Sequence, residues 1–219
     1  MPSFRCEAIL FDLDGVLVDS TPCVTRVWAA WAREHDLDPD YVVPLAHGQR
    51  TIETVRQVAP LLDAQRETDR IEEQEVSDTD GLRVLPGAKE LLTALATDRY
   101  TVVTSGTRRL ATKRLQVAGL PVPPRMITAD DVAHGKPDPE PYLAGAKMLG
   151  REPQKCLVFE DAPSGILSAK AAGMVAIGLT TTYGRDQLLE ADVIVPSLTA
   201  VKIRTEPSGE LMVIVETGS

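Results

Sequence analysis

Apolar residues occur along the chain in short continuous runs separated by longer amphipathic stretches. The short runs are apolar throughout, as expected of strands covered on both faces of a parallel sheet. They predict strands at 8–13, 100–104, 125–128, 156–159, 175–179 and 193–195. The stretches between them predict helices at 86–97, 108–118, 140–149 and 163–172, three of which are followed by a glycine of the kind that ends helices. This alternation predicts an α/β fold whose ligands bind at the carboxyl ends of parallel strands.

One interval interrupts the alternation. Residues 24–34, 51–60 and 64–77 have helical spacing or helix-favouring composition, and no convincing strand lies among them. We therefore expect residues 19–82 to form a helical domain inserted into an α/β core of residues 1–18 and 83–219. The two crossings, 15–21 and 81–87, are hinge candidates. Near the end of the chain, runs at 201–205 and 211–215 flank a Pro-Ser-Gly turn and predict a β-hairpin.

Charge and hydropathy restrict the partners. The 219 residues include 32 acidic and 23 basic side chains, a formal charge of −9 without a basic cluster. This balance argues against nucleic acids and anionic membranes, both of which select clustered Lys and Arg. The longest apolar runs are far below the roughly 20 residues that span a bilayer, and the N-terminal segment lacks a signal-peptide pattern. We therefore expect a cytoplasmic protein.

The cysteines and histidines are few and scattered. They are Cys6, Cys23, Cys156, His35, His47 and His134. Their spacing fits neither a disulfide framework nor a Cys/His zinc site. A bound metal ion would therefore be held by carboxylates.

Two carboxylates follow the first predicted strand directly. Asp12 and Asp14 are two residues apart, so both side chains can face one cavity. One can attack as a nucleophile or bind a hard cation while the other transfers protons. An aspartate-rich turn that ends the strand is the structural alternative.

Two further segments could bind an anion. Ser105 and Gly106 follow the next strand and precede a helix, where backbone N–H groups attract negative charge. An ordinary helix cap is the alternative. Lys136 lies between Gly135 and Pro137, in a rigid loop that suits a fixed cation, although a surface lysine would also fit.

A second carboxylate pair, Glu160 and Asp161, ends the strand at 156–159, just before Pro163 begins a helix. Because parallel strands bring their carboxyl ends to one edge, this pair should lie near Asp12 and Asp14. Carboxylate oxygens and water are the ligands that Mg²⁺ prefers.

In combination these segments resemble the haloacid dehalogenase-like superfamily, specifically its magnesium-dependent phosphatases with a helical cap inserted after the first motif. The resemblance spans nearly the whole chain. The segments 47–51, 104–107, 135–142 and 159–165 are most similar to sugar- and polyol-phosphate phosphatases, which include enzymes for 2-deoxyglucose 6-phosphate, glycerol phosphate and hexitol phosphates. The resemblance implies a Rossmann-like, doubly wound parallel sheet with a small helical cap.

The resemblance also implies roles for the carboxylates. Asp12 would attack phosphorus and form an aspartyl-phosphate. Asp14 would protonate the leaving alcohol and then activate the water that hydrolyses this intermediate. Mg²⁺ would be held by Asp12, the backbone carbonyl of Asp14 and Asp161, with Glu160 assisting directly or through water.

The remaining expected roles concern the substrate. Ser105, Gly106 and Lys136 would bind the phosphoryl oxygens. A cap loop would face the site and select the substrate, unless it is an ordinary loop before a helix; its candidate residues are His47, Gln49 and Arg50. Trp28 and Trp31 share a helical face and are expected in the core of the cap rather than in a sugar-stacking platform.

The leading interpretation is a Mg²⁺-dependent phosphatase for a small sugar or polyol phosphate. Alternatives are a sugar phosphomutase of the β-phosphoglucomutase type, a phosphoglycolate phosphatase, and a regulatory protein that binds a sugar phosphate without turnover. The complete carboxylate set argues against the last of these. We expect a monomer, with a dimer as the alternative, and a small phosphorylated metabolite as partner.

Overall fold

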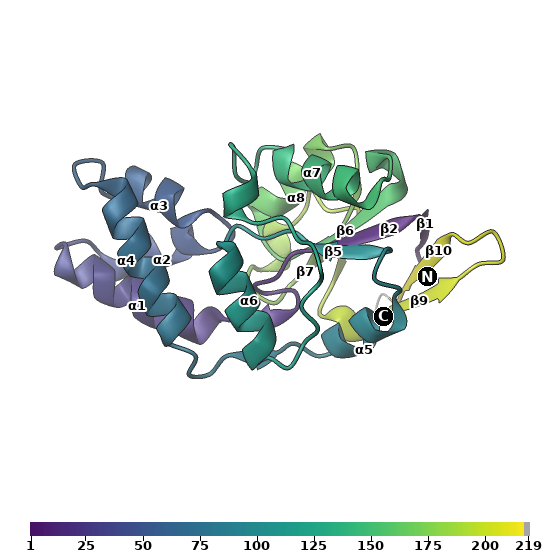
Figure 1. The fold of residues 1–219 in the computed structure, drawn as a ribbon, viewed down its shortest axis with the longest axis horizontal. Coiled ribbons are helices and arrows are strands. Elements are labelled where there is room, and N and C mark those ends of the chain that lie inside the picture. The colour runs from purple at the N-terminus through teal and green to yellow at the C-terminus, as the bar shows by residue number, and fades with distance from the viewer. Residues whose placement is uncertain (217–219) are drawn as a thin grey trace.

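The computed structural model describes residues 1–216 of the chain (Figure 1). Its strands are β1 (Ser3–Cys6), β2 (Ala8–Phe11), β3 (Val18–Asp19), β4 (Arg83–Val84), β5 (Tyr100–Val102), β6 (Cys156–Glu160), β7 (Val175–Leu179), β8 (Val193–Val195), β9 (Val201–Thr205) and β10 (Leu211–Val215). Its α-helices are α1 (Thr21–Glu34), α2 (Pro39–Ala46), α3 (Thr51–Val58), α4 (Ala64–Ser77), α5 (Ala88–Ala94), α6 (Arg108–Val117), α7 (Glu140–Leu149) and α8 (Pro163–Ala171).

The centre of the molecule is a parallel sheet with the strand order β5-β2-β6-β7-β8. Alternate residues of β2 face opposite layers: Ile9 and Phe11 pack with residues of α5 and α6, and Ala8 and Leu10 pack with residues of α7 and α8 (Figure 1). Both faces are therefore buried, which explains why the strands are apolar throughout. The predicted doubly wound α/β fold is confirmed.

Some predicted elements differ from the structure. The segment 125–128 is not a strand; it contributes one isolated bridge, between Ile127 and Val103. The prolines at positions 121, 123 and 124 have no N–H to donate, so the bridge cannot extend into a ladder in the N-terminal direction. The helix predicted at 86–97 is shorter, since Gly87 precedes it with a φ of +87°. Helix α2 was missed because Pro44 interrupts its helical pattern. The C-terminal hairpin is confirmed, and β1 pairs with β10 to extend it.

Helices α1 to α4 form a bundle at one end of the molecule (Figure 1). We call residues 19–82 the cap and the rest the core, the division predicted from the sequence. Trp28 and Trp31 pack edge to face in the cap, with ring centroids 5.5 Å apart. The Trp31 indole donates to Glu67 over 2.9 Å. Both tryptophans therefore belong to the apolar core of the cap, and Trp28 also reaches the wall of the cavity described below.

The chain crosses between core and cap at β3 and β4, which pair with each other through Val18 with Val84 and Asp19 with Arg83. An ion pair of 2.7 Å joins the Arg83 and Asp19 side chains at the same place. The predicted hinge segments are therefore held side by side.

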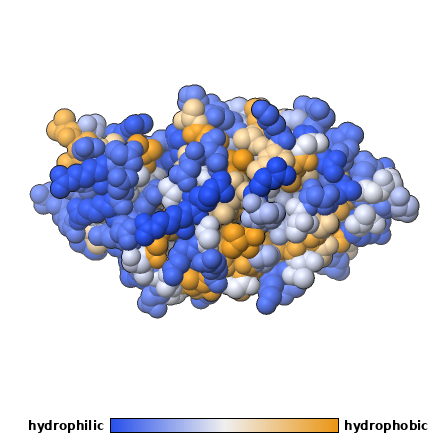
Figure 2. All heavy atoms as spheres, in the orientation of Figure 1, coloured by the Kyte–Doolittle hydropathy of each residue, from blue (hydrophilic) through white to orange (hydrophobic). Residues whose placement is uncertain are grey.

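In residues 1–216 no helix has the length and apolar character needed to cross a membrane. Figure 2 shows mostly hydrophilic side chains over the cap on this face.

Candidate active site

The predicted site segments meet at the carboxyl edge of the sheet. Strand β2 lies between β5 and β6, and the backbone N–H of Asp12 donates to Phe159 over 3.0 Å. Asp12 therefore lies next to Glu160, although 148 positions separate them along the chain. This adjacency follows from the strand order.

Lys136 is the buried cation of the site, with 1% of its side chain exposed. Its Nζ donates to Asp12 Oδ1 and Glu160 Oε1, both at 2.6 Å, and to the Val103 carbonyl at 3.1 Å. Burial alone would lower the pKa of Lys136, but the two carboxylates outweigh it and raise this pKa. Lys136 is therefore a fixed charge rather than a surface lysine.

Glu160 uses both carboxylate oxygens within the protein. Oε1 accepts from Lys136 Nζ and, at 2.8 Å, from the Tyr142 hydroxyl. Oε2 accepts from the backbone N–H groups of Asp161 at 2.9 Å and Ala162 at 3.1 Å, where α8 begins. A Cβ at Gly165 would lie 1.7 Å from Oε1, so this close approach requires glycine. Tyr142 was missed because its apolar surroundings in α7 give no sign of a polar partner.

Three buried carboxylates form a cluster that could hold a metal ion. Asp12, Glu160 and Asp161 are 6%, 1% and 4% exposed, and each offers an oxygen within 4.8 Å of the others. With Lys136 the four groups carry a charge of −3 + 1 = −2 when ionised. Burial, partly offset by Lys136, raises the pKa of Asp12 to about 7, and burial with Glu160 raises the pKa of Asp161 well above its usual range. A divalent cation would offset this buried negative charge.

The donor set fits a hard cation best at Asp12 and Asp161. Glu160 also lies close enough to Asp12 and Asp161 to share a metal ion with them. Its two oxygens already accept four hydrogen bonds, however, so it is a poorer ligand. Asp161 lies against Gly15, where an added Cβ would be 1.9 Å from Oδ2. Gly15 also has a φ of +77°, so both space and backbone conformation require glycine after Asp14.

Asp14 makes an ion pair that the sequence analysis did not predict. Its Oδ2 accepts from Arg114 of α6 at 2.7 Å, and the other end of this guanidinium lies 3.2 Å from Glu75 of α4. Asp14 Oδ1 is buried and has no hydrogen-bond partner among residues 1–216. Arg114 is 4% exposed and lies one turn after the buried Leu110, so a charged residue on the apolar face of α6 was the available signal.

The predicted phosphate-binding turn contacts the cap. Ser105 Oγ donates to the Gly48 carbonyl over 3.1 Å, and Ser164 Oγ donates to the same carbonyl over 3.2 Å. The Gly106 N–H donates to the Thr104 hydroxyl over 3.1 Å. The cap loop therefore sits directly on the turn that was expected to bind phosphoryl oxygens.

The candidate cap residues point in two directions. His47 and Gln49 line the cavity, where burial lowers the pKa of His47. The Arg50 guanidinium instead pairs with Glu53, at 2.9 Å from Nε, and donates to the carbonyls of residues 132 and 133 at 3.2 and 3.0 Å. Arg50 therefore binds the core loop that carries Lys136. We expected its side chain to face the cavity, and it does not.

The cavity between cap and core encloses about 50 Å³. From the core it is lined by Asp12, Asp14, Thr104, Ser105, Gly106, Leu110 and Arg114. From the cap it is lined by Ser20, Val24, Trp28, Ala46, His47, Gly48, Gln49, Thr51 and Glu75. Cap and core residues both line this space, so a movement of the cap would change the room available to a substrate. We call the observed arrangement, with cap and core in contact, the closed form.

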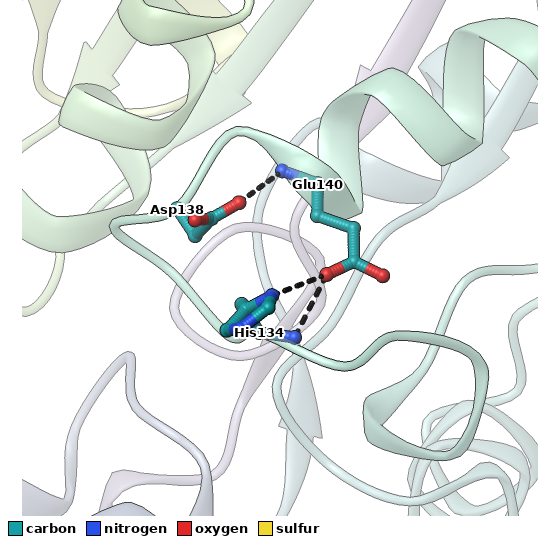
Figure 3. Close-up of side chains that lie close together, drawn as sticks. All are labelled: His134, Asp138 and Glu140. Atoms are coloured by element: carbon teal, nitrogen blue, oxygen red, sulfur yellow. Dashed lines mark hydrogen bonds and ion pairs between the residues drawn. The ribbon is translucent and has the colours of Figure 1, made fainter.

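A second cluster of possible metal ligands lies on the loop that carries Lys136, and its members brace that loop (Figure 3). The Glu140 carboxylate accepts from the backbone N–H of Ala133 at 2.9 Å and of His134 at 2.8 Å, and lies 3.1 Å from His134 Nδ1. Asp138 accepts from the Glu140 N–H at 2.9 Å. These hydrogen bonds explain why the three side chains lie close together: they stabilise the loop.

Comparison with known proteins gives consistent results. The model of the haloacid dehalogenase-like hydrolases matches residues 6–173. Hexitol phosphatase A of Escherichia coli (strain K12) is 41% identical over 95% of this chain and 99% of its own length. Glycerol-1-phosphate phosphohydrolase 2 of Saccharomyces cerevisiae is 36% identical over 92% of this chain and 86% of its own length. The crystal structure of a hydrolase from Pseudomonas syringae superimposes with a TM-score of 0.80 and 27% identity, over 89% of this chain and 94% of that one.

Proposed function

The chain belongs to the haloacid dehalogenase-like hydrolases and is a phosphoric monoester hydrolase, and we propose that it hydrolyses a small sugar or polyol phosphate with Mg²⁺ through an aspartyl-phosphate. One observation carries the proposal. The buried cluster of Asp12, Asp161, Glu160 and Lys136 lies at one edge of the sheet beneath the cap, with Asp14 beside it. In this arrangement Asp12 would be the nucleophile, Asp14 the proton-transfer group and Lys136 a fixed charge, next to a cavity lined by cap and core.

In this proposal the chain's own residues carry the reaction. Asp12 Oδ1 is held by Lys136, which leaves Oδ2 to attack phosphorus. The bond from phosphorus to the alcohol oxygen breaks, and Asp14 delivers a proton to that oxygen. Asp14 then takes a proton from a water that attacks the aspartyl-phosphate, which releases phosphate and restores Asp12. Closure of the cap excludes other water during these steps.

The groups that support the phosphoryl transfer come from three loops. Ser105 Oγ, the Gly106 N–H and Lys136 would bind phosphoryl oxygens, with a phosphoryl oxygen taking the place of the Gly48 carbonyl as the acceptor for Ser105. Mg²⁺, held by Asp12, Asp161 and the backbone carbonyl of Asp14, would supply positive charge against the charge of the phosphoryl group. Glu160 would act indirectly, because it positions Lys136 and the start of α8.

The substrate class is supported by the curated relatives. A hexitol phosphatase and a glycerol-phosphate phosphohydrolase match this chain over at least 92% of its length, which includes the cap. In the cap, His47 and Gln49 line the cavity and could read hydroxyl groups of a polyol. The substrate would be a small phosphorylated metabolite, as the names of these two relatives indicate.

The test is phosphate release from a panel of hexitol, glycerol, 2-deoxyglucose and glycolate phosphates, with and without Mg²⁺. We expect release from sugar or polyol phosphates that requires Mg²⁺ and falls at least 1,000-fold in Asp12→Asn, since that variant lacks the nucleophile. Asp98→Asn is the matched control, because Asp98 is exposed and precedes β5 at the opposite edge of the sheet. Isomerisation of a hexose 1-phosphate without phosphate release would instead indicate a mutase. Undiminished turnover in Asp12→Asn would refute the assigned nucleophile.

A further inference from the structure

We propose that Arg114 is a positioning residue for Asp14, and that Glu75 makes this positioning depend on closure of the cap. The inference rests on the proposed function, because it takes Asp14 to be the proton-transfer group. It concerns three charged side chains from three separate parts of the fold: the loop after β2, the core helix α6 and the cap helix α4. All three line the same cavity.

The ion pair limits the orientations of the Asp14 carboxylate. Arg114 Nη1 lies 2.7 Å from Oδ2, and only 5% of the arginine side chain is exposed. Oδ1 is left buried and without a hydrogen-bond partner among residues 1–216. Since a buried oxygen without a partner is unfavourable, Oδ1 is the atom available to a hydroxyl of the substrate or to water. Arg114 therefore directs one oxygen away from the reaction and leaves the other free for the proton.

Glu75 supplies the dependence on the cap. It lies on α4, its side chain is 5% exposed, and its Oε2 is 3.2 Å from Arg114 Nη2. With the cap closed, the guanidinium is held at both ends, by Asp14 and by Glu75. When the cap moves away, Arg114 loses the second partner and the hydration of its charge is restored, so the position of Asp14 is less restricted. Proton transfer would thus be efficient only in the closed form.

The same two helices provide a matched control. Arg109 of α6 and Glu73 of α4 form an ion pair between core and cap, with 63% and 59% of their side chains exposed. This pair joins the two helices without contacting Asp14. Variants of Arg109 and Glu73 therefore test the attraction between cap and core, whereas variants of Arg114 and Glu75 test that attraction together with the positioning of Asp14.

The experiment compares two aryl esters with different leaving groups, phenyl phosphate and p-nitrophenyl phosphate. The nitrophenolate leaves readily without a proton, whereas the more basic phenolate depends on the acid. We expect Arg114→Met to lower kcat/KM for phenyl phosphate by about 10- to 100-fold and for p-nitrophenyl phosphate by less than about threefold, since kcat/KM reflects phosphoryl transfer and not the later hydrolysis of the aspartyl-phosphate, in which Asp14 serves both esters alike. The loss is at or below the lower end of the range for general acid catalysis because Asp14 itself remains. Glu75→Gln should show the same selectivity with a smaller loss. Arg109→Met and Glu73→Gln should leave the ratio of the two esters unchanged.

A double-mutant cycle separates positioning from a general loss of structure. In an Asp14→Asn background, Arg114→Met should lower kcat/KM no further, because there is no proton-transfer group left to position. Equal losses for both esters, or a full additional loss in Asp14→Asn, would overturn the role of Arg114. A Glu75→Gln variant that behaves like Glu73→Gln would overturn the role of the cap. Arg114→Lys keeps the charge and serves as the test if Arg114→Met does not fold. It should also lower the rate more for phenyl phosphate than for p-nitrophenyl phosphate, by a smaller factor than Arg114→Met. An equal loss for both esters in this variant would count against the proposal.

Neither ester carries a sugar or polyol, so this result is independent of the substrate panel. If no sugar or polyol phosphate in the panel releases phosphate, but the Arg114 variants lose more activity on phenyl phosphate than on p-nitrophenyl phosphate, the proposed substrate class is refuted and the role of Arg114 remains. Release of phosphate from polyol phosphates with no selectivity in the Arg114 variants would do the reverse.

Discussion

Exchanging Glu160 for glutamine changes the site by one heavy atom and removes acceptors that four donors require. Oε1 accepts from Lys136 and Tyr142, and Oε2 accepts from two backbone N–H groups. An amide can accept at one of these positions only. In either orientation its NH₂ group faces two donors, so two hydrogen bonds are lost whichever way the amide turns.

The size of the effect follows from these contacts. A hydrogen bond to a charged group contributes about 1.5–3 kcal/mol, and a donor left buried without an acceptor costs about 1–3 kcal/mol. Two such losses would reach roughly 5 kcal/mol, and removal of one negative charge from a cluster of charge −2 offsets part of this sum. We expect Glu160→Gln to lower the free energy of unfolding by about 3 kcal/mol, which corresponds to a decrease in Tm of about 6–12 °C.

The measurement is urea unfolding followed by circular dichroism, in the presence of a chelator so that metal binding does not contribute. Tyr142→Phe removes one of the four hydrogen bonds and should cost about 1 kcal/mol. Glu73→Gln makes the same chemical change in an exposed ion pair and should stay within about 0.5 kcal/mol of the wild type. A Glu160→Gln protein as stable as Glu73→Gln would refute the reasoning.

Two further predictions concern the metal site and the cap. Gly15→Ala should abolish Mg²⁺-dependent turnover and weaken Mg²⁺ binding measured by calorimetry, because its Cβ would displace Asp161 and its φ of +77° disfavours a side chain; Mg²⁺ affinity equal to that of the wild type would contradict this. Burial at the cap–core interface raises the pKa of Glu72 to about 7. The negative charges of Glu75 and Asp130 add to this rise, and a hydrogen bond with Thr107 opposes it. A raised carboxyl pKa means that the folded state binds more protons than the unfolded state, so stability falls as pH rises from about 4.5 to 7. Glu72→Gln should therefore be more stable than the wild type by about 1 kcal/mol at pH 8, after allowance for partial exposure, and equal to it near pH 4.5; an equal gain at both pH values in urea unfolding would exclude this cause.

Most of the fold and of the candidate site could be predicted because the relevant signals are local. Asp12, Ser105 and Glu160 lie at or shortly after the ends of apolar strands, and parallel strands bring such ends to one edge. The helical insert was visible for the same reason, since its periodicity differs from that of the flanking segments. The strand expected at 125–128 was wrong: the segment forms one isolated bridge, and the prolines before it prevent the bridge from extending toward the N-terminus.

The sequence did not predict which charged side chains pair with one another. The sequence identified Asp14 and Lys136, but Lys136 lies in a loop before α7, so its contact with Asp12 across 124 positions depends on how that loop packs against the edge of the sheet. A charged residue on the apolar face of α6 indicated that Arg114 is buried, but nothing local indicated that its partner would be Asp14, 100 positions earlier in the chain, or that Arg50 would bind a core loop. Those contacts depend on how α6 packs against α4 and how the cap rests on the core. The candidate site residues are therefore identified by short segments, because a strand carries its own end residues to the edge, whereas the contacts between these residues and the cap arise from the packing of helices distant in sequence.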